Sequence, residues 1–196
     1  MSAIGDRYER RSRAFAAKIA ATPTDRWTSP SPCEHWLARD VVAHIVEMHE
    51  IVLGRATDRN GSTSLAPSDF DPLTAFDGVR TRAAAVLADP TTPTELARAI
   101  DDELGIDLPQ HGWDLAKATG QDPTIDPVDV AELWAAVSLF TPSQWSFMRT
   151  PGSFGPGIVV YGPEVAVPAS APLQDRLLGL LGRDPRWTPA GLGELD

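Results

Sequence analysis

Apolar residues recur at helical spacing through most of the chain and predict a mainly helical protein. Within residues 3–21, Ile4, Tyr8, Phe15 and Ile19 are spaced for one face of a helix. Similar patterns predict further helices over residues 39–56, 72–88, 128–140 and 172–181. A single antiparallel helical bundle is the simplest architecture that buries all of these faces. The fold class expected is therefore all-α.

Several of the predicted helices begin at recognisable capping sequences. Asp71-Pro72 and Asp126-Pro127 place a carboxylate at the cap position and a proline in the first turn. Thr92-Pro93-Thr94-Glu95 and Thr141-Pro142-Ser143-Gln144 add a glutamate or glutamine three residues after the threonine, which is the pattern of a capping box. We therefore expect helices to start at all four places.

One long helical pattern contains two residues that oppose helix formation. It runs from Thr94 to Thr119 and includes Gly105 and Pro109. Proline has no amide hydrogen to donate and clashes with the preceding turn. The sequence therefore predicts a break near Gly105 and a restart with Pro109 in the first turn, so that Asp107 lies at or near the start of the restarted helix.

Prolines interrupt the C-terminal region at positions 151, 156, 163, 168 and 172. Two short apolar runs there, 158–161 and 165–167, suit extended chain, but the prolines oppose a regular sheet. The organisation expected is a helical bundle over residues 1–150 and a Pro/Gly-rich tail over residues 151–196. The tail carries a short helix and packs on the bundle as part of the same domain.

Composition narrows the classes of partner. The 196 residues include 17 Lys+Arg and 27 Asp+Glu, a formal charge of −10, which argues against electrostatic binding to nucleic acid or to an anionic membrane surface. No apolar run approaches the roughly 20 residues of a membrane-spanning helix, and the arginine-rich N-terminal segment is unlike a signal peptide. We expect a soluble, cytoplasmic protein that binds small molecules or proteins.

The pattern with the clearest chemical meaning consists of Asp107, His111 and Asp114. Residues at positions i, i+4 and i+7 share one helical face, so the three side chains can converge as they do in a metal site. Asp40 and His44 have the same four-residue spacing, which is common by chance. Asp40 is expected to cap or start its helix, where a carboxylate is favourable.

The other histidines and the single cysteine suggest structural roles first. His49 lies deeper in the apolar arc of its helix than His44, and the two point about 140° apart, which argues against a metal shared between them. His49 and His35 are expected to be packing or capping residues. Cys33 has no second cysteine nearby and is expected to be a buried thiol. A redox, nucleophilic or ligand role for it remains the alternative, and a redox role predicts fast alkylation at neutral pH.

Four blocks of sequence occur in order along the chain: Trp27 to Trp36, Arg39 to His44, Asp107 to Gly120, and Pro172 to Pro185. They resemble an actinobacterial family of metal-binding proteins that is similar to the N-terminal domain of mycothiol-dependent maleylpyruvate isomerase, within the DinB-like superfamily. The resemblance covers nearly the whole chain. It implies a DinB-like four-helix bundle whose divalent metal is held by a histidine of the second helix and by two residues, four apart, of a later helix.

Applied to this chain, the resemblance implies His44, Asp107 and His111 as the metal ligands. Asp114 and Glu47 become expected acceptors for the imidazole N–H groups of the ligand histidines. Two imidazoles and one carboxylate suit a zinc ion with a fourth position left for water or substrate. Zinc is expected first, and nickel, iron or manganese accept similar donors.

In characterised relatives the cosubstrate is a low-molecular-weight thiol, which is mycothiol in actinobacteria. The resemblance therefore implies a metal-dependent S-transferase or isomerase-like enzyme that acts on this thiol and an electrophile the sequence does not identify. The alternative is a non-catalytic metal-binding or dimerising helical module. The resemblance also allows a homodimer through helix faces.

Overall fold

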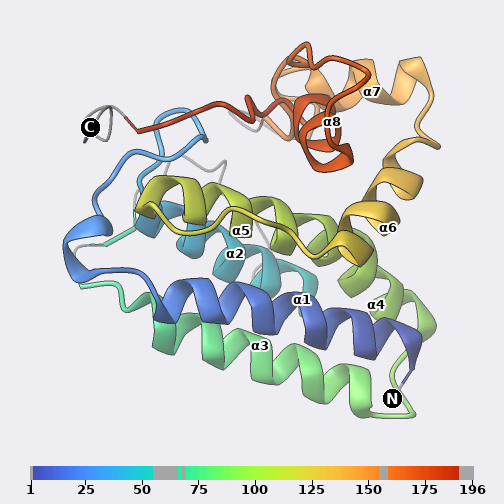
Figure 1. The fold of residues 1–196 in the computed structure, drawn as a ribbon. Coiled ribbons are helices and arrows are strands. Elements are labelled where there is room, and N and C mark those ends of the chain that lie inside the picture. The colour runs from blue at the N-terminus through green and yellow to red at the C-terminus, as the bar shows by residue number, and fades with distance from the viewer. Residues whose placement is uncertain (1, 55–65, 68, 155–158, 190–196) are drawn as a thin grey trace. The chain divides into compact units, whose positions relative to one another are not determined.

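The computed structural model describes residues 2–54, 66–67, 69–154 and 159–189, and within these ranges the regular elements are helices, with no β-strand (Figure 1). The prediction of an all-α protein is therefore confirmed. The run 165–167, which suits extended chain, forms no strand, and Ile158 of the other run lies outside the described residues. None of the described helices has both the length and the apolar character needed to cross a membrane.

Contacts divide the chain into two compact units. Among the described residues, the first comprises 2–54, 66–67, 69–123 and 189, and the second comprises 124–154 and 159–188. Each unit is described below by itself. The expected single domain, with a bundle over 1–150 and a tail over 151–196 packed on it, stays a prediction.

The first unit is a four-helix bundle. Its long helices are α1 (Ala3–Ala20), α2 (Ala38–Val52), α3 (Pro72–Ala88) and α5 (Gly105–Thr119). Each of α1 and α2 packs against both α3 and α5, which places α1 and α2 at opposite corners of the bundle. In Figure 1, α1 and α5 run in one direction and α2 and α3 in the other.

Apolar side chains from all four long helices fill the core of this bundle. They include Tyr8, Phe15, Ile19, Val41, Ile45, Phe76, Val79, Leu108 and Leu115. The rings of Phe15 and Phe76 meet edge to face with their centroids 4.9 Å apart, which is a favoured aromatic geometry. Full burial of such a side chain contributes about 1.5–3 kcal/mol to folding.

Helices begin at all four predicted places, but one of them lacks the predicted capping box. Backbone amides donate to the side chains of Asp71, Asp126 and Thr141, at the starts of α3, α6 (Pro127–Val137) and α7 (Pro142–Arg149). At the fourth place the helix α4 (Thr94–Ala99) begins after Pro93 without a side-chain cap. The Thr92 hydroxyl instead donates to the Val86 carbonyl, 2.5 Å away, and so holds the preceding turn.

Two helices end earlier than the apolar pattern predicts. α2 ends at Val52 rather than at residue 56, and Gly54 adopts a left-handed conformation with φ of +73°. Glycine adopts this conformation without steric cost, so it commonly ends a helix. α6 ends at Val137 rather than at residue 140. In both places the apolar residues continue into the turn that follows the helix.

The predicted break near Gly105 is wrong. α4 passes into a π-helical turn, Ile100–Leu104, which leads directly into α5, and the backbone stays in the right-handed helical region at Leu104 and Gly105. Pro109 is the fifth residue of α5 and lies inside the helix. Asp107 is therefore part of an uninterrupted helical run rather than of a helix start.

The second unit contains the short helices α6, α7 and α8 (Leu173–Leu180), of which α6 and α8 pack together. An irregular segment is fixed to α8 by a hydrogen bond from the Val165 amide to the Gly179 carbonyl, 2.9 Å long. Gly179 permits this close approach, because a Cβ there would lie 2.6 Å from the Val165 oxygen. The short helix predicted over residues 172–181 is confirmed as α8.

Candidate metal centre

The middle of α2 and the first half of α5 bring together the three residues that the family resemblance implies as metal ligands. His44 lies in α2, and Asp107 and His111 lie one helical turn apart in α5, which packs against α2. The Nε2 atom of His44 is 3.9 Å from Oδ2 of Asp107, and one donor atom from each of the three residues lies within 4.8 Å of the other two. The imidazoles of His44 and His111 meet nearly edge to face, with centroids 4.8 Å apart.

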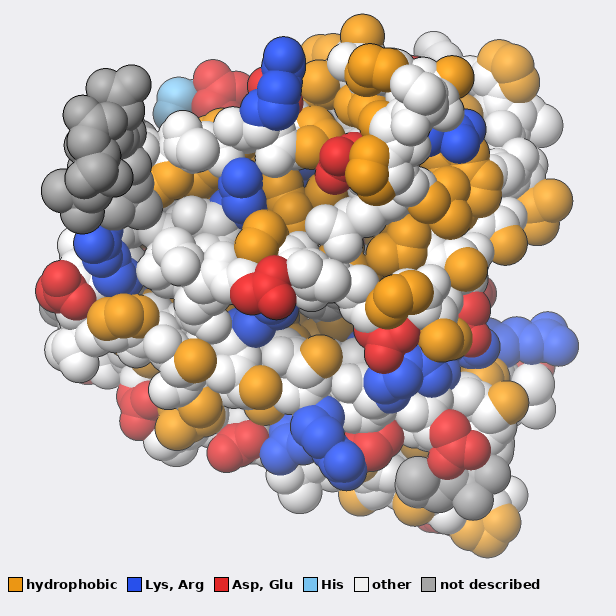
Figure 2. All heavy atoms as spheres, viewed as in Figure 1, with side chains coloured by type: hydrophobic (Ala, Val, Ile, Leu, Met, Phe, Trp, Pro, Cys, Tyr) orange, Lys and Arg blue, Asp and Glu red, His pale blue; other side chains and the backbone are white. Residues whose placement is uncertain are grey.

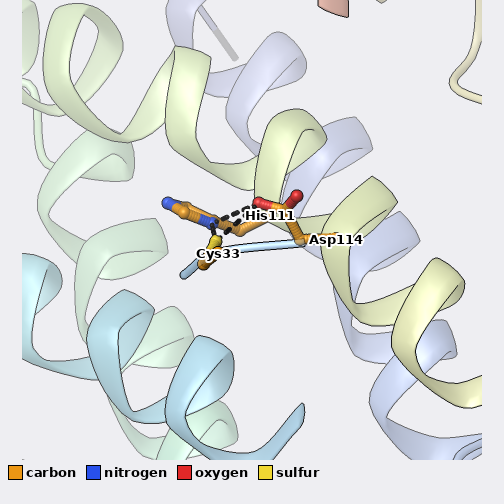
Figure 3. Close-up of side chains that lie close together, drawn as sticks. All are labelled: Cys33, His111 and Asp114. Carbon is orange, nitrogen blue, oxygen red and sulfur yellow. Dashed lines mark hydrogen bonds and ion pairs between the residues drawn. The ribbon is translucent and has the colours of Figure 1, made fainter. Parts of the chain in front are cut away.

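Asp114 lies within hydrogen-bond distance of the His111 ring. Nδ1 of His111 is 2.9 Å from Oδ2 of Asp114, one turn further along α5. The same carboxylate oxygen accepts from Sγ of Cys33 at 3.2 Å, and that sulfur is 3.9 Å from His111 Nδ1 (Figure 3). Because Nδ1 is engaged by Asp114 and Cys33, Nε2 is the ring nitrogen that remains for a metal.

These contacts alter the protonation of His111. Burial lowers the pKa of His111, but its hydrogen bonds to Asp114 and Cys33 and the negative charge of Asp114 raise it more, to about 10. Without a metal, the imidazole is therefore held as a cation beside the Asp114 carboxylate. A metal that binds Nε2 must displace the proton from that atom, so metal uptake releases protons and is favoured by rising pH.

A tight loop places Cys33 against α5. The loop closes through a hydrogen bond from the Ser31 amide to the Trp36 carbonyl, 2.9 Å long, and one from the Trp36 amide to the Cys33 carbonyl, 3.0 Å long. His35 has a φ of +67°, a left-handed conformation that is uncommon for a residue other than glycine. The loop therefore holds the buried thiol at a fixed position directly before α2.

Trp36, from the same loop, covers both imidazoles. Its ring stacks on His111 with centroids 5.8 Å apart and an interplanar angle of 27°, and it lies 4.9 Å from the His44 ring. The side chains of His44 and Asp107 keep 17% and 24% of their exposure, whereas that of His111 keeps 7%. The donor set is therefore enclosed on one side and reached from solvent past His44 and Asp107.

Two acidic residues of α2, Glu47 and Asp40, differ in how the structure places them. Partial burial raises the pKa of Glu47, and its role as an acceptor for His44 stays a prediction. Asp40 has the capping role expected for it, since its carboxylate accepts from the amides of Leu37 at 2.8 Å and Ala66 at 2.7 Å. The Asp40 carboxylate therefore serves the start of α2 rather than the candidate metal centre.

Cys33 and Trp36 are the parts of the centre that sequence reasoning missed. Cys33 was expected first to be a buried thiol, with a redox, nucleophilic or ligand role as the alternative, and no role at the site was expected for Trp36. The structure buries Cys33 as predicted but places it on the Asp114 carboxylate, within a buried group of donors that also includes His111. Both residues lie in the first of the four blocks that resemble the family. That resemblance did not indicate that they would contact His111.

Comparisons with known proteins give one family match and two similar proteins. Residues 8–135 match the family described as the mycothiol maleylpyruvate isomerase N-terminal domain. Two uncharacterized proteins of Mycobacterium tuberculosis, one from strain CDC 1551 / Oshkosh and one from strain H37Rv, are each 30% identical to the chain over 195 residues. Each alignment covers 91% of this chain and 97% of the relative. No solved structure matches the chain.

Proposed function

The chain belongs to the mycothiol maleylpyruvate isomerase N-terminal domain family, and we propose that it is a divalent-metal-dependent enzyme that acts with a low-molecular-weight thiol. The observation that carries the proposal is the convergence of His44, Asp107 and His111, whose donor atoms lie within 4.8 Å of one another. A thiol S-transferase or isomerase-like reaction is the class of chemistry proposed.

The spacing of His44 and Asp107 fits a zinc ion with only a small adjustment. Two ligands that each lie about 2.1 Å from one ion at a tetrahedral angle are about 3.4 Å apart. Nε2 of His44 and Oδ2 of Asp107 are 3.9 Å apart, so they need to close by about 0.5 Å, which a side-chain rotation achieves. Zinc is proposed first, with nickel, iron or manganese as metals that accept the same donors.

Each residue around the site has a distinct task. When bound, the metal supplies Lewis acidity at an open position and lowers the pKa of a coordinated thiol. Asp114 accepts the hydrogen bond from His111 Nδ1 and so fixes the direction of the ligand ring. Trp36 covers the imidazole faces and excludes water from that side of the site. His44 and Asp107 line the side from which the thiol and its electrophile enter.

The identity of the thiol is taken from the family. The description of the matching family names mycothiol and maleylpyruvate isomerase, which supports mycothiol as the cosubstrate proposed here. The electrophile is a small molecule able to accept or release a thiolate. Calorimetric titration of the metal-loaded protein with mycothiol is expected to show binding, whereas the EDTA-treated protein and the oxidised disulfide of mycothiol should give little or none.

Metal content tests the proposal directly. Protein purified without a histidine tag is expected to contain close to one equivalent of metal, and His44→Ala and His111→Ala are each expected to lose it. His35→Asn removes an exposed histidine outside the site, and asparagine tolerates the left-handed backbone there, so it serves as the matched control. Equal metal content in all four proteins would refute the proposed ligand set.

A second candidate function, a non-catalytic dimerising module, is favoured by apolar side chains exposed on the second unit. Leu139 is 81% exposed and Phe147 is 53% exposed, and the Phe147 ring packs on Phe154 with centroids 5.1 Å apart. Hydrophobic side chains are prominent over α7 at the upper right of Figure 2. Sedimentation velocity distinguishes the two functions: a metal-free dimer that Phe147→Ser converts to a monomer would favour the module.

A further inference from the structure

The carbonyl of Gly105 has lost its usual helical partner. In an α-helix this oxygen accepts from the amide of the residue four positions later, which here is Pro109 and has no hydrogen. The guanidinium of Arg11, from α1, donates to the Gly105 oxygen instead, with an Nη1 to oxygen distance of 2.8 Å. The side chain of one helix thus replaces the missing amide of another.

The surroundings are built for this contact. Arg11 is 5% exposed, so its charge lies away from water and depends on hydrogen bonds within the protein. A Cβ at Gly105 would lie 3.0 Å from Nη1 of Arg11, which is closer than a side-chain carbon normally comes to another atom. Glycine at position 105 therefore gives the guanidinium room to reach the backbone.

A second arginine of α1 holds the preceding turn. Arg7, one turn before Arg11, makes two hydrogen bonds to Asp101, of 2.8 and 2.6 Å, and Asp101 lies in the π-helical turn. Because α1 and α5 run in the same direction, residues four apart on α1 meet residues four apart on the α4 to α5 segment. The two arginines therefore tie both the π turn and the first turn of α5 to α1.

We propose that Arg11 is a positioning residue for the metal centre, acting by replacing the amide that Pro109 lacks. The turn that it closes, from Gly105 to Pro109, is the turn that carries Asp107. The alignment of Asp107 with His111 depends on the shape of this turn. The hydrogen bond from Arg11 of α1 to the Gly105 carbonyl holds that shape. This inference rests on the proposed function for its metal. That the Arg11 guanidinium replaces the missing amide can be tested separately.

Cobalt(II) is a suitable probe, because its visible absorption reports the geometry of the ligands it binds. Arg11→Met keeps the aliphatic bulk of the side chain and removes the donor. It is expected to weaken Co²⁺ binding by roughly 10–100-fold, the effect typical of losing a group that orients a metal ligand. Arg13→Met is the matched control: Arg13 lies on the same helix, is exposed and pairs with Glu9. It should bind Co²⁺ as the wild type does.

Rescue by Pro109→Ala identifies the mechanism. Alanine at position 109 has an amide hydrogen that can bond to the Gly105 carbonyl, so the Arg11→Met/Pro109→Ala double variant is expected to recover most of the lost affinity. A double variant as weak as Arg11→Met would overturn the inference, as would equal affinities for Arg11→Met and Arg13→Met. Where Arg11→Met does not fold, Arg11→Lys, which keeps a donor, takes its place with a smaller expected loss.

Thermal unfolding in EDTA separates this inference from the proposed function. Arg11→Met is expected to lower the melting temperature by roughly 2–4 °C more in the wild-type background than in the Pro109→Ala background. Wild-type protein that binds no Co²⁺ would refute the metal function, and the EDTA experiment would still decide whether Arg11 replaces the amide. Equal shifts in both backgrounds would overturn that replacement. Tight Co²⁺ binding that Arg11→Met leaves unchanged would overturn the positioning role alone.

Discussion

Lowering the pH is expected to destabilise the bundle through His49, a histidine enclosed in the core. Its Nδ1 atom is 2.6 Å from the Ile45 carbonyl oxygen, and its Nε2 atom is 2.9 Å from the Tyr8 hydroxyl. A carbonyl only accepts, so Nδ1 carries the hydrogen and Nε2 accepts from Tyr8. Burial lowers the pKa of His49 to about 4; the bond to Ile45 and the charge of Glu50 raise it slightly, and Arg82 lowers it further.

The size of the effect follows from this shift. The ordinary pKa of His49 is 6.5 and its pKa in the folded protein is about 4. Between pH 6.5 and pH 4, the unfolded chain therefore binds a proton at this ring and the folded protein does not. The stabilisation from the neutral imidazole is therefore fully present above pH 6.5 and is lost as the pH falls toward 4. Between pH 7.5 and pH 5.0 the loss amounts to about 2 kcal/mol of unfolding free energy.

Two measurements check this reasoning. Urea unfolding in EDTA at both pH values should show that wild type loses about 2 kcal/mol more than His49→Gln does, since only the wild type carries this histidine. His35→Asn should behave as wild type, because His35 is exposed. Titration of the His49 ring by NMR needs no variant at all. A ring that titrates near its ordinary value in the folded protein would refute the argument.

Three further experiments test other parts of the structure. Asp114→Asn is expected to weaken Co²⁺ binding roughly 10–100-fold in a calorimetric titration, because the ligand imidazole loses its carboxylate; an unchanged Kd would contradict the orienting role. Gly179→Ala is expected to destabilise by about 1–3 kcal/mol in urea, since its Cβ would lie 2.6 Å from the Val165 oxygen, whereas Gly78→Ala, with 3.9 Å of clearance, should stabilise by about 0.5–1 kcal/mol. Equal effects would rule out the packing explanation. Buried Cys33 should react with iodoacetamide far more slowly in native protein than in denaturing urea, and equal rates would support a redox role.

Helices could be predicted from the sequence where the deciding interactions are local. α1 and α3 begin and end within one residue of the predicted bounds, because an apolar face and a cap or a following turn are all contained in the segment itself. The end of α2 depended on Gly54, whose left-handed backbone stops a helix that the apolar pattern continues. Thr92 is a second case in which the local pattern was not enough. Its hydroxyl donates to the Val86 carbonyl of the previous helix instead of capping the next one.

Continuity through Pro109 could not be predicted, because it depends on distant residues. A missing amide and a crowded turn are local facts, and they predict a break. What sustains the helix is a donor 94 positions away in sequence, Arg11, together with a π-helical turn before α5. Neither leaves a periodic signal in the sequence near Pro109. Asp107 lies in this segment. The helix that continues through Pro109 against its local sequence preference is therefore next to the candidate site.

The helical spacing of Asp107, His111 and Asp114 predicted convergence on one point, and the structure divides that convergence in two. Asp114 bonds to Nδ1 of His111, on the side where Cys33 also lies, while Asp107 stands with His44. The two nitrogens of an imidazole ring point in different directions. Two carboxylates on opposite sides of one histidine therefore have different partners. The residue spacing alone treats both carboxylates as equal ligands. Their surroundings separate them: Asp114 is fully buried and accepts from the Cys33 thiol, whereas Asp107 lies beside His44 and keeps 24% of its exposure.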